Sequence, residues 1–148
     1  MNIFTALRES HDLQRALCRR LVTKKLGPAA REATFVQLAI ELAAHAAAEE
    51  RFLYAPLLMA DAGLSASRHA LAEHHEAEEL VEALKVRDKG SAAWLRRARE
   101  LSTCVRHHLD EEEQGFFQLA GRLLTATQKT RLAKRYLTDL ARMRKLLG

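Results

Sequence analysis

The segment HAAAEERFLYAP, residues 45–56, has a counterpart 63 residues later in the segment HLDEEEQGFF, residues 108–117. This offset superimposes His45 on His108, Glu49 on Glu112, and Glu50 on Glu113. It also places His11 on His74, and within each half the two histidines are 34 residues apart. An internal repeat with matched spacing predicts two similar helical hairpins that face each other about a pseudo-twofold axis.

The chain consists mainly of helix-forming residues, and only two prolines and six glycines interrupt its 148 residues. Periodicity and turn residues predict five helices. The first two cover residues 3–24 and 28–58, and a turn follows at 61–65. A third helix reaches about residue 87, Ser91 caps a fourth, and Thr127 caps a fifth over 127–147. Short loops between long helices indicate antiparallel neighbours. We therefore predict an all-α fold of one domain: an up-down-up-down antiparallel four-helix bundle over residues 1–126, with an additional C-terminal helix, 127–148, packed on it.

Polar side chains interrupt the apolar seam of each bundle helix, and buried polar groups are usually paired or bound to a metal. Because an α-helix rises about 1.5 Å per residue, the two histidines of a hairpin, at comparable distances from its turn, reach the same height. Each glutamate follows the second histidine by four residues, one turn along the same face. The predicted ligands of two divalent ions, with the glutamates as bridges, are His11, His45, Glu49, His74, His108 and Glu112.

This choice of ligands depends on the repeat and not on a local motif. Six of the seven histidines have a glutamate four residues later, so an isolated H-x-x-x-E carries no information here. His75 and His107 adjoin proposed ligands but lie about 100° round the helix, so we expect them, like His69, at the surface. The alternative interpretation of the seam histidines is a buried, hydrogen-bonded set without metal.

Other metal-binding folds fit less well. Ferritin-like sites use E-x-x-H, and no histidine of this chain has a glutamate three residues before it. A zinc protease requires H-E-x-x-H, but the pair His75-Glu76 is followed by Glu79 where the second histidine would stand. Zinc is compatible with the predicted site as a substitute ion, because imidazole and carboxylate also bind it.

The chain resembles the hemerythrin-like, HHE cation-binding family over nearly its whole length. The resemblance is carried by Ser10-His11-Asp12, by residues 45–56, by Glu73-His74 and by residues 108–117. It implies a non-haem di-iron centre bridged by two carboxylates and an oxo or hydroxo group. By position, the implied ligands are His11, His45, His74 and His108, with Glu49 and Glu112 bridging.

The pattern differs from that of the oxygen-carrying members of the family. Those proteins have a fifth histidine four residues from the third-helix ligand, whereas here the positions four residues from His74 hold Ala70 and Glu78. On the fourth helix they have an aspartate five residues after the histidine, whereas this chain carries H-x-x-x-E. One coordination position is then open, or filled by water or Glu78. The closer resemblance, to bacterial proteins of iron-centre repair and nitrosative stress, implies a protein that binds or reacts with dioxygen, nitric oxide or peroxide. A peroxide-consuming enzyme and an iron sensor or regulatory module are the alternatives.

The net charge of +5 is concentrated at the C-terminus, because residues 127–148 contain seven basic residues and one acidic residue. Leu132, Tyr136, Leu140 and either Met143 or Leu147 recur there at helical spacing, so we expect this face to pack on the bundle and the basic residues to lie in solvent. The weaker alternative is that these basic residues contact nucleic acid or an acidic partner. Aromatic residues for base stacking are not interleaved with them, so nucleic-acid binding would depend on the phosphate backbone and fall steeply with salt.

The remaining expectations concern location and core. The chain has no signal-like apolar run and no stretch of about 20 apolar residues, so we expect a cytoplasmic protein without a membrane span. Cys18 and Cys104 are too few for a disulfide framework and are expected to be buried, with redox-active thiols as the alternative. The residues expected to seal the core around the site are Phe52, Leu53, Tyr54, Phe116 and Phe117.

Overall fold

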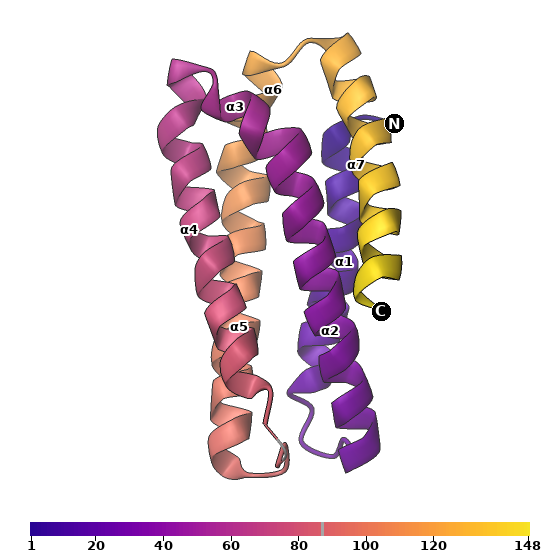
Figure 1. Cartoon of the computed structure of the whole chain (residues 1–148). Coiled ribbons are helices and arrows are strands. Elements are labelled where there is room, and N and C mark those ends of the chain that lie inside the picture. Colours follow the sequence, from indigo (N-terminus) through magenta and orange to yellow (C-terminus); the bar gives the residue numbers. More distant parts are fainter. Residues whose placement is uncertain (87) are drawn as a thin grey trace.

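The computed structural model describes residues 1–86 and 88–148, and its elements are helices joined by short connections. One hairpin is formed by α1 (Ile3–Leu21) and α2 (Pro28–Glu49), the other by α4 (Asp61–Leu84) and α5 (Ala92–Glu111). The four helices run alternately up and down, and α7 (Ala126–Leu147) lies outside the bundle along α1 and α2 (Figure 1). The predicted all-α bundle with an additional C-terminal helix is confirmed.

The second helix of each hairpin contains one turn of π-helix at equivalent positions. α2 continues through η1 (Glu50–Tyr54) into the short α3 (Ala55–Leu58), and α5 continues through η2 (Glu112–Phe116) into α6 (Phe117–Leu123). A π-turn pairs residues five apart, unlike the surrounding α-helix, and such turns are frequent at functional sites. Glu49 directly precedes η1 and Glu112 is the first residue of η2, so the π-turns change which side chains share a face with these predicted ligands.

Helix caps account for most of the boundaries. Ser91 caps α5 as predicted, because its hydroxyl accepts from the N–H of Trp94 at 3.1 Å. The prediction that Thr127 caps the last helix is wrong. Thr125 is the N-cap, and it forms a reciprocal capping box with Gln128, three residues on. That motif needs Glu or Gln three residues after the cap, and Thr127 is followed at that distance by Thr130.

The connection between the hairpins is shorter than predicted. Residues 61–65 were expected to form a turn, but α4 begins at Asp61, and only Met59 and Ala60 separate it from α3. Gly63 permits a close approach rather than a turn, since a Cβ at this position would lie 2.6 Å from the carbonyl oxygen of Leu57. The ends of α1 and α4, at Leu21 and Leu84, precede the predicted ends at 24 and 87; residue 87 itself is outside the described residues.

The apolar core has two parts with a polar layer between them. Leu7 belongs to the part near α3 and α6, and Leu17 belongs to the part near the hairpin loops; His11 lies between them on α1. Leu132, Tyr136 and Leu140 of α7 extend the first part, as the helical spacing predicted, whereas Leu147 is exposed.

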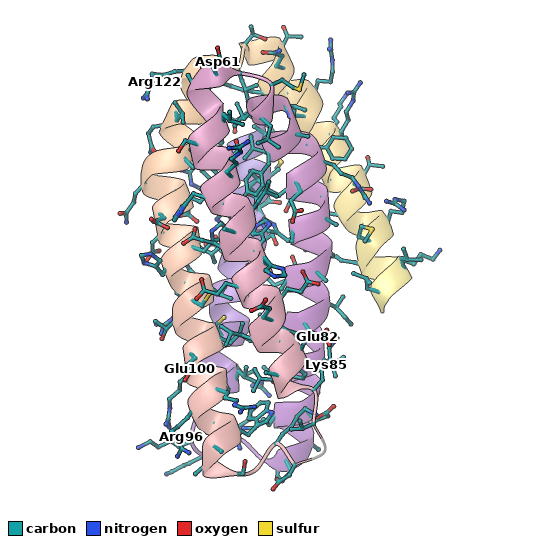
Figure 2. The ribbon with its side chains drawn as sticks, turned by 60° about the vertical axis from the view of Figure 1, so that its left-hand side comes forward. Asp61, Glu82, Lys85, Arg96, Glu100 and Arg122 are labelled. Atoms are coloured by element: carbon teal, nitrogen blue, oxygen red, sulfur yellow. The ribbon has the colours of Figure 1, made fainter. Side chains whose placement is uncertain are left out.

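Charged side chains cover the outside of the bundle. Figure 2 shows Glu82 on α4, Lys85 directly after it, and Arg96 and Glu100 on α5. Within residues 1–86 and 88–148, no helix has the length and apolar content that crossing a membrane requires.

Candidate metal centre

The six predicted site residues meet in the polar layer of the core. Ligand atoms of His11, His45, Glu49 and Glu112 all lie within 4.8 Å of one another, and those of Glu49, His74 and His108 form a second such group. Glu49 belongs to both groups. Most of the layer is shielded from solvent, since His11 and Glu49 are fully buried and Glu112 is 2% exposed, whereas His74 is partly exposed.

Each glutamate contacts one histidine from each hairpin. Oε1 of Glu49 lies 3.3 Å from Nε2 of His45 and 3.1 Å from Nε2 of His74. Oε1 of Glu112 lies 3.1 Å from Nε2 of His11, and its Oε2 lies 3.6 Å from Nε2 of His108. Each carboxylate thus contacts a histidine of both hairpins, which is the position that a carboxylate bridging two ions would need.

Four buried polar atoms of this layer have no hydrogen-bond partner. They are Nε2 of His11, Nε2 of His45, Oε2 of Glu49 and Oε1 of Glu112, because the short contacts at these atoms lack hydrogen-bond geometry. A buried polar atom left unpaired costs about 1–3 kcal/mol. Four such atoms facing one point fit a divalent cation, which binds imidazole nitrogen and carboxylate oxygen together.

In each of the four histidines of the layer, the other ring nitrogen, Nδ1, has a partner outside the layer. Nδ1 lies 2.6 Å from Glu113 in His11, 2.7 Å from the hydroxyl of Tyr136 in His45, 2.9 Å from Glu50 in His74, and 2.8 Å from Glu73 in His108. Since a carboxylate only accepts, the three glutamates keep the hydrogen on Nδ1 and leave Nε2 free to bind a metal. Sequence reasoning did not identify these partners.

Tyr54 was expected only to seal the core around the site, but its hydroxyl lies within the site. The hydroxyl lies 2.8 Å from Oε1 of Glu49 and also hydrogen-bonds Glu112. It is 3.3 Å from Nε2 of His74. The π-turn explains this position, because Tyr54 follows Glu49 by five residues. The equivalent residue of the other hairpin is Phe117, whose ring stacks on that of His11 at 5.7 Å.

Without a metal, the layer retains protons that a cation would displace. Burial lowers the pKa of His11 and of His74, but hydrogen bonds to glutamates outweigh it and raise the two pKa values to about 9 and about 10. Burial and the neighbouring charge of Glu49 raise the pKa of Glu112 to about 7. Burial also opposes ionisation of Glu49, but His45 and His74 lower its pKa well below the usual value.

A cavity of about 350 Å³ between α2 and α4 reaches the layer from outside. It touches His45, His74 and His108, and alanines line much of it: Ala39, Ala43, Ala46 and Ala47 from α2 and Ala77 from α4. Glu82 near the end of α4 and Lys85 directly after it also border the cavity (Figure 2). Glu78 borders the cavity too but is exposed, and its carboxylate belongs to neither of the two buried groups.

The remaining histidines and the cysteines lie apart from this layer. The side chains of His69, His75 and His107 are 62%, 70% and 67% exposed. His69 lies near Glu73 and Glu111 at the surface. Exposed charged groups of this kind are solvated by water and need no metal. Cys18 is buried and Cys104 half-buried, and burial raises the pKa of both thiols to about 11, so both remain protonated at neutral pH.

Comparison with known proteins agrees with this geometry. The sequence model of the hemerythrin HHE cation binding domain matches residues 2–120. A search of the curated proteins gave no match. Among solved structures, the chain is similar to a hemerythrin HHE cation binding domain-containing protein from Mycobacterium kansasii, with a TM-score of 0.85 and 23% identity over 98% of this chain and 88% of the other. At this identity the similarity concerns the fold.

Proposed function

Because the chain belongs to the hemerythrin HHE cation-binding family, we propose that it is a non-haem di-iron protein that binds or reacts with dioxygen, nitric oxide or peroxide. The observation that carries this proposal is the position of Glu49 and Glu112, each within reach of one histidine from both hairpins. A role in oxidative or nitrosative stress, in the cytoplasm, is part of the same proposal.

The donor set divides into two halves with shared oxygens. His11 and His45 would hold one ion, and His74 and His108 would hold the other. Glu49 and Glu112 would bridge the two ions together with an oxo or hydroxo group. Imidazole and carboxylate suit iron, and they also suit zinc, so zinc is the substitute to test. When bound, a pair of ferrous ions supplies electrons and open coordination positions to a small ligand.

The α2–α4 cavity gives a small ligand access to the layer. Alanine side chains leave space beside His45, His74 and His108, while Gln14, Glu50 and Glu78 line other parts of the cavity. The alanine-lined part suits dioxygen and nitric oxide, which need no polar anchor. The charged residues of the lining are Glu50, Glu78, Glu82 and Lys85, a set that does not favour an anionic ligand.

Consumption of peroxide is the second candidate, and Tyr54 favours it. Burial and the charges of Glu49 and Glu112 raise the pKa of Tyr54 well above its usual value, so the phenol keeps its proton at neutral pH. The hydroxyl oxygen lies 3.3 Å from Nε2 of His74 and donates its proton to the carboxylates of the layer, so the proton lies beside the position where a peroxide oxygen would need one. A sensor or regulatory module has no comparable observation in its favour.

Metal analysis combined with an optical spectrum tests the proposal. Metal-free protein is loaded with ferrous iron without oxygen, and the spectrum is recorded before and after oxygen, nitric oxide or peroxide is added. We expect two iron ions per chain and a change of spectrum with at least one ligand. One ion or none per chain, or a spectrum that no ligand changes, would contradict the proposal.

A further inference from the structure

A second cavity, of about 280 Å³, reaches the polar layer between α4 and the continuous helix of α5, η2 and α6. The buried residues His108 and Glu112 form its inner end. Its outer end includes His69 and Glu111, whose side chains are 62% and 44% exposed. This α4–α5 pocket shares only His108 with the α2–α4 cavity, so the layer has two separate openings.

The fixed charges of the α4–α5 pocket have one sign. Glu73, Glu111 and Glu112 line it, and its lining residues, all in the described part of the chain, include no lysine or arginine. The α2–α4 cavity, by contrast, has Lys85 among its glutamates. A cleft lined by charges of one sign concentrates ions of the opposite sign and raises the rate at which they bind. The α4–α5 pocket therefore attracts cations.

Three side chains at the outer end have the spacing of cation ligands. Ligand atoms of His69, Glu73 and Glu111 lie within 4.8 Å of one another. Nε2 of His69 is 3.3 Å from Oε2 of Glu111 and 3.6 Å from Oε2 of Glu73. The other oxygen of Glu73, Oε1, lies 2.8 Å from Nδ1 of His108. One carboxylate thus joins this group to a proposed ligand of the layer. Because water solvates exposed groups well, they would hold an ion weakly and release it.

The inner end of the pocket presents a buried oxygen without a partner. Glu112 is 2% exposed, and its Oε1 has no hydrogen-bond partner. This oxygen lies 3.1 Å from Nε2 of His11, which also has none. Burial of an unpaired polar atom is costly, and a cation would remove that cost. An ion that leaves the outer group would therefore find a stronger site at the inner end.

The equivalent face of the first hairpin is closed. The 63-residue offset pairs the three outer residues with small side chains: His69 with Ala6, Glu73 with Ser10, and Glu111 with Ala48. These small residues are at most 1% exposed. The helix α7 packs along α1, α2 and η1 and lies away from α4 and α5 (Figure 1). Imidazole and carboxylate groups therefore occupy these positions only in the hairpin that α7 leaves uncovered.

We propose that His69, Glu73 and Glu111 form a transient binding site for divalent cations, from which ions pass through the α4–α5 pocket to His108 and Glu112. Metal then enters the layer by a different opening from the one that the α2–α4 cavity gives to a small ligand. This inference rests on the proposed function, because it needs a metal centre in the layer. An entry site speeds binding and release equally, so its loss changes the rates and leaves the affinities unchanged.

The rate of Co²⁺ uptake tests the entry site. Co²⁺ alone is mixed with metal-free protein in a stopped-flow spectrometer, and wild type is compared with Glu111→Gln, Glu111→Lys and His69→Gln. Charge in a cleft raises association rates about 10–10³-fold. We expect Glu111→Gln and His69→Gln to take up Co²⁺ about 10-fold more slowly than wild type, and Glu111→Lys more slowly still. Salt should slow wild type more than Glu111→Lys. The affinities of both binding steps, measured by chelator competition, should not change.

Glu79→Gln and Glu79→Lys are the matched controls. Glu79 is also exposed beside a histidine, with Oε1 2.8 Å from Nε2 of His75, but it lines neither cavity. Its variants should take up Co²⁺ at the wild-type rate. Equal rates in wild type and Glu111→Lys, or the same slowing in the Glu79 variants, would overturn the entry site. A loss of affinity that matches the loss of rate would also overturn it, since Glu111 would then act on the layer itself. Binding of fewer than two Co²⁺ ions by wild type would contradict the proposed function, and the comparison of rates would still test the entry site.

Discussion

Oε1 of Glu49 lies 3.1 Å from Nε2 of His74, although the two residues belong to different hairpins. The same oxygen lies 3.3 Å from Nε2 of His45, a residue of its own helix. One carboxylate thus contacts both halves of the repeat, so in the proposed centre a ligand shared by two ions would also stabilise the pairing of the hairpins.

Replacement of this carboxylate should remove the bridge. Glu49→Gln keeps the shape but exchanges one oxygen for a nitrogen that donates, so it is a poor ligand. We expect the metal content to fall from two ions per chain to one or fewer, measured after dialysis. Glu79→Gln is the control, because Glu79 also follows a histidine by four residues but lies exposed beside His75. Retention of two ions by Glu49→Gln would mean that Glu49 is no bridge.

The register of α4 can be tested with neighbouring histidines. His74→Ala removes an imidazole whose Nε2 faces Glu49, whereas His75→Ala removes one that is 70% exposed. We expect iron affinity to fall at least about 10-fold in the first variant and to stay unchanged in the second, by chelator competition. The opposite result would place the ligand at His75.

Much of this site was predictable because the repeat and the apolar seams depend on local spacing. The residues that meet in the layer, including His11 and His108, follow from an offset that is visible in the chain. Tyr54 did not follow, because α-helical periodicity places a residue five positions after Glu49 on another face, and the π-turn shifts it back. The contact of Tyr136 with His45 joins residues 91 apart and has no counterpart in the repeat, so no spacing could indicate it.

Metal affinity should rise with pH, while the stability of the metal-free protein falls. The pKa values of His11 and His74 rise from 6.5 to about 9 and about 10 in the metal-free fold. The stability that these protonated histidines contribute is therefore complete below pH 6.5 and lost as pH rises through 9 to 10. A metal competes with the same protons, so affinity should increase over this range.

Urea unfolding of metal-free protein at pH 6 and pH 9, together with Zn²⁺ titrations at both values, measures the two trends. The metal-free protein should unfold at lower urea concentration at pH 9, and protons should be released on metal binding. His75→Ala should show the same trends as wild type, because this residue is exposed. Affinity that is equal at the two pH values would argue that the histidines are not the ligands.

The α2–α4 cavity should control how fast a ligand arrives. Ala46→Phe places a large ring in the lining, next to His45, and should slow binding of nitric oxide about 10-fold or more without changing metal content. Ala33→Phe on the same helix is the control, since Ala33 is exposed and is not part of the lining. Stopped-flow spectra measure the rates. If Ala46→Phe binds nitric oxide as fast as wild type, the ligand uses another path.

Tyr54→Phe separates the structural and chemical roles of the phenol. The variant keeps the ring, which lies 5.1 Å from that of His74, and removes only the hydroxyl. In the metal-free protein, Glu49 and Glu112 lose a buried hydrogen-bond donor, so we expect a loss of about 1–3 kcal/mol in the free energy of urea unfolding. The metal-loaded protein should lose less, because the cations then satisfy both carboxylates.

The chemical role is measured on the same variant with metal content held equal. If Tyr54 supplies a proton in peroxide consumption, the rate should fall by roughly 10²-fold, the contribution typical of a positioned acid. Phe117→Tyr, which adds a hydroxyl at the equivalent position of the other hairpin, should not restore the rate in the Tyr54→Phe background, because Phe117 stacks on His11 and not beside His74. An unchanged rate in Tyr54→Phe would remove the argument for peroxide consumption and leave ligand binding as the function to pursue.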